Sequence, residues 1–227
     1  MSGYLQSGWF AAARRVLLAV AVVLAGSGLC SAAEVIDRIV ATVNRHPILQ
    51  SEWDEAVGFE CLVNGRPLQH LTPDDRIQTL ERMIDQELTG EQMRASSFVP
   101  ATAEEIAGRV QELRGTVPAW KTDEGWRAAM ASHDLTEEDV EERIALQVNL
   151  SRYLDLRFRR EIHIDQRAIE RYYRQQLLPQ LHRAGAPEPP LQQVAPMIEQ
   201  LLTEQRLNEL QDQWVRALRT QGDIRVR

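Results

Sequence analysis

Residues that could carry out chemistry are few and widely spaced in this chain of 227 residues. The two cysteines form no C-x-x-C pair, and no H-x-x-H pair occurs among the five histidines, which are His46, His70, His133, His163 and His182. Because a metal site readable from sequence needs donors within one turn or tight loop, the spacing predicts no metal site. The sequence contains no G-x-S-x-G, P-loop or dinucleotide-binding pattern, so we predict no catalytic residue and no cofactor.

Paired carboxylates are the other groups that could act together as an acid and a base. They occur at Glu104-Glu105 and at 137–139, in each case within three residues of a threonine, Thr102 or Thr136. A threonine followed by acidic residues is typical of a helix start, where the carboxylates stabilise the positive end of the helix dipole. We therefore interpret both groups as structural.

Similar helix-start signals recur along most of the chain and predict a mainly helical fold. Thr72, Thr122 and Asp165 each stand where a side-chain oxygen can accept a hydrogen bond from the first turn of a helix. The helix predicted from 136 to about 160 carries apolar residues over an arc of roughly 220°. A surface helix needs a narrower stripe, so we expect this helix to be packed on two or more sides.

Both ends of the mature chain carry strand-like sequence. Val35 to Val43 is rich in β-branched residues, 44–47 has turn composition, and Ile48-Leu49 continues as a second short strand. We expect Ser51 to cap the helix that follows. Alternation within Asp223–Arg227 predicts a third strand, and we expect it to pair with the hairpin because two strands alone are only marginally stable.

A proline-rich segment at 179–190 predicts a linker before a final helix at 191–221. The apolar residues of this helix change face halfway along, so its two halves should pack against different neighbours. The first face comprises Val194, Met197, Ile198, Leu201 and Leu202, and the second comprises Leu207, Leu210, Trp214 and Leu218.

The first 33 residues have the pattern of a cleaved secretory signal. Two arginines precede an apolar run from Val16 to Ala25, and small residues follow at 31–33. The apolar run is shorter than the roughly 18 residues of a membrane-spanning helix. A lipid anchor at Cys30 is disfavoured, because the bulky Leu29 stands where a lipobox has a small residue.

Charge and cysteine content narrow the classes of partner. The formal net charge is −7, and removal of the two signal-peptide arginines makes the mature chain more acidic still. An acidic protein is poorly suited to bind nucleic acid or an anionic membrane, so we expect neither. Cys61 is the one cysteine left after cleavage, which excludes an intramolecular disulfide; we interpret it as a small, partly buried apolar residue.

The opening of the mature chain resembles that of the SurA-type periplasmic chaperones. The residues that carry this resemblance are D-R-I-V-A-T-V-N at 37–44 and I-L-Q-S-E at 48–52, and R-R-E-I-H-I-D at 159–165 also resembles the family. The resemblance covers 34–178 and implies a periplasmic protein that holds unfolded polypeptides. Many members carry a parvulin-type prolyl isomerase domain, but this chain has neither an H-I-L-V strand nor a G-G-D-L-G turn, nor room for a domain of roughly 100 residues.

A chaperone of this kind needs apolar surface that fits unrelated clients, for which methionine and aromatic side chains are well suited. We expect this surface in the weakly periodic segment from 93 to 130 and on the first half of the final helix. There Met197 and Leu201 should border a groove with Trp120 and Trp126, or form a contact between two copies of the chain. The predicted binding residues are Met93, Phe98, Val99, Val117, Trp120, Trp126, Met130, Met197 and Leu201.

The sequence thus predicts a signal peptide at 1–33, a helical chaperone core at 34–178, a linker at 179–190, and a C-terminal helix and strand at 191–227 that pack back on the core. The expected fold is mainly α, with a small antiparallel sheet joining the chain ends. The expected function is a periplasmic holdase for unfolded secreted or outer-membrane polypeptides. Two alternatives stay open: a prolyl isomerase with a degenerate site, and an interaction subunit with one fixed partner.

Overall fold

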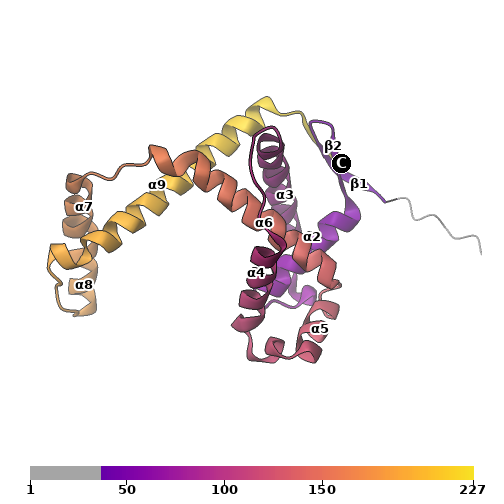
Figure 1. Ribbon diagram of the computed structural model, residues 1–227, viewed down its shortest axis with the longest axis horizontal. Coiled ribbons are helices and arrows are strands. Elements are labelled where there is room, and N and C mark those ends of the chain that lie inside the picture. The colour runs from indigo at the N-terminus through magenta and orange to yellow at the C-terminus, as the bar shows by residue number, and fades with distance from the viewer. Residues whose placement is uncertain (1–36) are drawn as a thin grey trace, which may run out of the picture. The chain divides into compact units, whose positions relative to one another are not determined.

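The computed structural model describes residues 37–227 (Figure 1). The predicted signal peptide, Cys30 and the first residues of the opening strand lie outside this range. The helices and strands are β1 (Ile39–Val43), β2 (His46–Leu49), α2 (Gln50–Val63), α3 (Pro73–Arg94), α4 (Ala103–Thr116), α5 (Asp123–Ala131), α6 (Glu137–Phe158), α7 (Gln166–Tyr172), α8 (Leu178–Ala184), α9 (Leu191–Gln221) and β3 (Ile224–Val226). The fold is therefore mainly α with a small sheet, as predicted.

The sheet joins the two ends of the described chain. Its strand order is β2-β1-β3, and β1 pairs antiparallel with both neighbours. The hairpin turns at Asn44, whose φ of 54° lies in the left-handed region that asparagine tolerates better than most residues. The backbone N–H of Asn44 donates to the Asp223 carbonyl oxygen at 2.8 Å, so the turn also holds the residue just before β3. The predicted third strand is confirmed, and Figure 1 shows the C-terminus beside β1 and β2.

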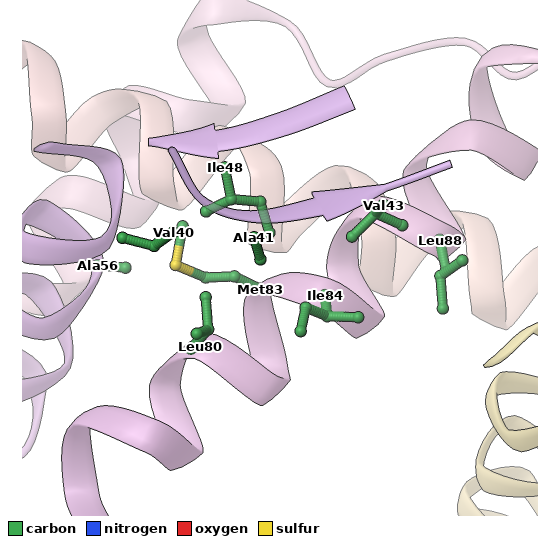
Figure 2. Close-up of a cluster of buried hydrophobic side chains, with 9 residues drawn as sticks. All are labelled: Val40, Ala41, Val43, Ile48, Ala56, Leu80, Met83, Ile84 and Leu88. Carbon is green, nitrogen blue, oxygen red and sulfur yellow. The ribbon is translucent and has the colours of Figure 1, made fainter. Parts of the chain in front are cut away.

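One hydrophobic cluster lies between this sheet and α3. Figure 2 shows that the side chains of the strands face those of the helix, with Met83 and Ile84 beneath the hairpin. Leu218 of α9 and Ile224 of β3 pack against the same cluster, so both elements of the C-terminal segment contribute to it. The buried members are Val40, Ala41, Val43, Ile48, Ala56, Leu80, Met83, Ile84 and Leu88.

A second cluster fills the space among α2, α4, α5 and α6. Trp126 is its largest fully buried side chain, and its ring lies 5.8 Å from that of Trp120, which belongs to the short 3-10 helix Pro118–Lys121. At Gly58 of α2 an added Cβ would lie 2.5 Å from the carbonyl oxygen of His133, so only glycine lets α2 approach the turn before α6 this closely.

Local capping explains where most helices begin. The threonines at 72, 102, 122 and 136 and Asp165 each accept a hydrogen bond from the first turn, which confirms all five predicted helix starts. The predicted cap at Ser51 is wrong, because α2 begins at Gln50 and its N-cap is Leu49, two residues before Ser51. The Ser51 hydroxyl instead donates to the carboxylate of Asp37, which also accepts from the Ser51 backbone amide.

The proline-rich segment is more helical than expected. A π-helical turn at Tyr173–Leu177 links α7 to α8, which covers the first part of the predicted linker; only 185–190 lies outside the helices. Pro179 is the second residue of α8, which follows directly after the π-helical turn. Gly185 ends α8 with a φ of 64°, which glycine adopts without strain.

Helix α6 contacts α2, α3, α4 and α9, which confirms that it is packed on several sides. Helix α9 contacts α3, α6 and α7, and Figure 1 shows α7 and α8 beside its first half. The predicted division of α9 is thus present, with different neighbours along its length. Among the described residues, no helix combines the length and apolar character of a membrane span.

Candidate functional site

A groove crosses α6 and consists of two hollows that share Gln147 and Ser151. The first hollow, of about 510 Å³, lies toward α2 and α4, and the second, of about 490 Å³, lies toward α3 and α9. The first is lined by Phe59, Val63, Arg109, Leu113, Ile144, Gln147, Val148, Ser151, Arg152 and Asp155. The second is lined by Arg82, Asp85, Gln86, Thr89, Gln147, Leu150, Ser151, Leu154, Gln211 and Val215.

Each hollow contains apolar contact surface. Phe59, Leu113 and Val148 belong to the second hydrophobic cluster or pack against it, so their positions are fixed by the core. Val63 extends this surface to the solvent and is 46% exposed. In the second hollow, Leu150, Leu154 and Val215 provide the corresponding apolar groups. Exposed apolar surface of this kind marks a candidate site for binding another polypeptide.

The charged residues that line the first hollow are all ion-paired. Arg109 pairs with Glu112 at 2.6 Å, Arg152 pairs with Glu105 at 2.7 Å, and Asp155 pairs with Arg159. The Arg152 guanidinium, followed by the Thr102 backbone amide, lowers the pKa of the Glu105 carboxyl. This carboxylate is therefore ionised at neutral pH, and its pairing leaves little net charge at this edge.

The charged residues of the second hollow are paired in the same way. Arg82 bonds to the Glu60 carboxylate, and Asp85 accepts from Arg219 of α9. Exposed pairs of this kind contribute little to stability, but they cancel the local charge. The groove thus has apolar patches, neutral polar groups at its centre and a balanced rim.

A third hollow, of about 330 Å³, lies between the hairpin and α6 and differs in its charge. Four glutamates and two arginines line it: Glu52, Glu55, Glu87, Glu142, Arg94 and Arg143. Burial, followed by repulsion from Asp139, raises the pKa of the Glu55 carboxyl. The local field in this hollow is therefore negative.

Most of the predicted binding residues between 117 and 130 lie in the core. Trp120, Trp126 and Met130 are buried members of the second cluster, and Val117 packs against it. This corrects the expectation that they line a surface. Their apparent lack of periodicity has a physical cause, because a short 3-10 helix and a short α-helix meet at Trp120 and Trp126 and point both rings into one cluster.

The other predicted residues lie at separate places. Met93 is half-buried near the end of α3, and Phe98 packs edge-on against Tyr153 with ring centroids 6.0 Å apart. Val99, by contrast, is 75% exposed. Met197 and Leu201 are 58% and 39% exposed on α9. They border no groove with the tryptophans, since the tryptophans are buried, and none of the nine predicted residues lines the three hollows.

The groove residues themselves were absent from the sequence-based prediction. Gln147 and Ser151 are single polar residues on an otherwise apolar side of α6, and neither belongs to a motif. The wide apolar arc of this helix was the one available signal, since it required neighbours on several sides. It could not show that the neighbours leave hollows between them.

Comparison with known proteins adds no further assignment. The chain matches no protein-family model, and no curated protein matches its sequence.

Proposed function

We propose that the mature chain is a periplasmic holdase that binds unfolded polypeptides along the groove over α6. The observation that carries this proposal is the pair of hollows of similar size joined through Gln147 and Ser151. An extended peptide directs alternate side chains to one face about 6.6–6.8 Å apart. We expect successive side chains of that face to enter the two neighbouring hollows. Its backbone would meet an amide and a hydroxyl group, both of which can donate and accept hydrogen bonds.

The electrostatic character of the groove supports clients of varied sequence. An unpaired arginine or carboxylate on the rim would favour clients of one charge, as charge complementarity does at protein interfaces. Here the lining charges are paired within the protein. Selection would therefore rest on apolar side chains and on backbone groups, which all unfolded polypeptides offer.

The compartment and client class rest on the sequence. The signal pattern and the resemblance of 37–52 to SurA-type chaperones support a periplasmic protein whose clients are secreted or outer-membrane polypeptides. The exposed Met197 and Leu201 supply a second apolar contact for a long client, or a contact between two copies of the chain.

The test fills the groove without altering the core. Ser151→Trp and Gln147→Trp place a bulky ring at the junction of the two hollows, and both positions are exposed. Leu156→Trp adds the same ring to α6 at an exposed position outside the hollows and serves as the matched control. We expect the first two variants to bind an unfolded outer-membrane polypeptide about tenfold more weakly, a loss of about 1.4 kcal/mol, and the control to bind as wild type does.

The readouts are fluorescence anisotropy of labelled peptides and suppression of client aggregation, with thermal melting to verify folding. Unchanged binding in both groove variants would contradict the proposal. Several unrelated clients should be tested, because activity on one client alone would favour the interaction subunit. A tetrapeptide assay addresses the isomerase alternative, and we expect no acceleration of X-Pro cis/trans relaxation above background.

A further inference from the structure

Three side chains of types that can bind metal ions, one from β2 and two from α3, meet at the edge of the sheet. His46 is the first residue of β2, and Glu87 and Glu91 are one turn apart on α3. His46 Nδ1 lies 3.4 Å from Glu87 Oε1 and 3.2 Å from Glu91 Oε1. One ligand atom from each of the three residues lies within 4.8 Å of the others.

The two distances from His46 to the glutamates are those expected between neighbouring ligands of a tetrahedral ion, and the third spacing, between the glutamates, is at most 4.8 Å. Zinc binds histidine nitrogen and carboxylate oxygen at about 2.0–2.1 Å, which places neighbouring ligand atoms of a tetrahedron about 3.3 Å apart. The two distances from His46 to the glutamates lie on either side of this value. Three protein ligands would leave the fourth position for water.

Asn44 holds one of these ligands in place. Its side-chain amide donates to Glu91 Oε2 at 2.5 Å, which leaves Oε1 directed at His46. Asn44 is itself fixed, because its Oδ1 accepts from the backbone amide of Asp223 at 3.0 Å. Hydrogen bonds of this kind orient the ligands in protein metal sites and raise metal affinity.

The surrounding charges favour a cation overall. Glu87 also lines the hollow in which four glutamates face two arginines. The nearest opposing charge is Arg94, whose guanidinium lies 2.6 Å from Glu87 Oε1. Arg94 is half-exposed at the end of α3, so its side chain can turn toward solvent when an ion approaches.

We propose that His46, Glu87 and Glu91 form a binding site for a divalent cation of the zinc class. The ion would tie the hairpin to α3 and, through Asn44, to the start of β3. It would therefore stabilise the closure of the chain ends and is independent of the groove over α6.

Calorimetric titration of untagged mature protein with zinc chloride tests this site, with thermal melting in parallel. We expect one zinc ion per chain and a rise in melting temperature. His46→Ala and Glu91→Gln should each weaken binding at least about tenfold, and Asn44→Gly, which preserves the positive φ, should weaken it about tenfold. Arg94→Gln should tighten binding, because it removes the competing cation.

A matched control uses the exposed contact between His182 and Glu188, which contains one carboxylate in place of two. The double variant His182→Ala/Glu188→Gln should bind zinc as wild type does. Cys61 is not expected to compete, because it is buried and burial raises the pKa of its thiol. The proposal is overturned if wild type shows no saturable binding, or if a folded His46→Ala/Glu91→Gln variant binds zinc as tightly as wild type.

Discussion

The two halves of α9 have similar apolar content but different surroundings. In the second half, the Trp214 ring lies 5.6 Å from that of Phe158 and 6.2 Å from that of Tyr153, and the Arg157 guanidinium lies over it at 4.7 Å. In the first half, Ile198 is buried, whereas Met197 and Leu201 are exposed. The second half of α9 is thus a structural segment, whereas the first half exposes apolar side chains to solvent.

Polar contacts make the same distinction. Arg219 at the end of α9 donates to the Glu81 carboxylate at 2.7 Å, to the Glu81 carbonyl at 2.9 Å and to Asp85. Three bonds from one rigid guanidinium fix the second half to α3 in one orientation. The apolar side of α9 is therefore core along only part of its length.

The largest expected loss of stability comes from truncating the apolar side chains of the second half of α9. Leu210→Ala together with Trp214→Ala should lower the free energy of unfolding by about 3–5 kcal/mol, as truncation of packed aromatic residues does. Chemical denaturation at neutral pH measures this loss. A loss below about 1 kcal/mol would mean that the aromatic contacts with α6 do not stabilise the fold and that the second half of α9 is not a structural segment.

Removal of Gly222–Arg227 should cause the next largest loss of stability, because it deletes β3 and leaves β1 paired with β2 alone. Two single substitutions in β3 separate the stability that comes from side-chain packing from the stability that comes from strand pairing. Ile224→Ser should cost about 2 kcal/mol because Ile224 packs on the first cluster, whereas Val226→Ser should cost less than about 0.5 kcal/mol because Val226 is exposed. Equal losses, measured by thermal melting, would refute the packing assigned to Ile224.

We expect low pH to destabilise α3, the helix that the second half of α9 contacts. Arg66, followed by Thr72, holds the pKa of Asp75 well below its ordinary value at the start of α3. A carboxyl whose pKa is lower in the folded state stabilises the protein at neutral pH, and this contribution is lost as the pH falls below about 4. We expect Asp75→Asn to be less stable than wild type at pH 7 and to lose less stability between pH 5 and pH 2.

Melting curves across this pH range measure the effect. Asp74→Asn is the control, since Asp74 is exposed at the same helix end but makes none of the bonds of Asp75. If Asp75→Asn and wild type show the same acid response, the ion pair with Arg66 does not contribute to the pH dependence.

The smallest effect on stability should come from the first half of α9. Met197→Ser together with Leu201→Ser should change the free energy of unfolding by less than about 0.5 kcal/mol per site, because both side chains are exposed. The same pair should weaken client holding or dissociate a dimer, which aggregation assays and sedimentation measure. A loss as large as that of the Leu210/Trp214 pair would make both halves core and remove the difference between them.

Local signals in the sequence determined much of this fold. A threonine followed by an acidic residue three positions later satisfies helix amides within a single turn, so Thr72, Thr102 and Thr136 could be read without knowing their surroundings. The alternation that predicted β3 and the change of face in α9 are likewise properties of short segments. The distant contacts of these segments agree with the local signals, since β3 pairs with β1 and the Arg152 guanidinium bonds to the Glu105 carboxylate without displacing the cap.

Contacts between distant segments were decided by the tertiary structure alone. Ser51 lies inside the first turn of α2, where its hydroxyl donates to the Asp37 carboxylate, 14 residues earlier in the chain. Trp120 and Trp126 are core because two short helices turn both rings into one cluster. Gln147 and Ser151 join two hollows only because four helices surround α6, and His46 meets Glu91 from 45 residues away. Hydrophobic periodicity shows which face of an element is buried, but the space left between elements depends on how they pack against one another.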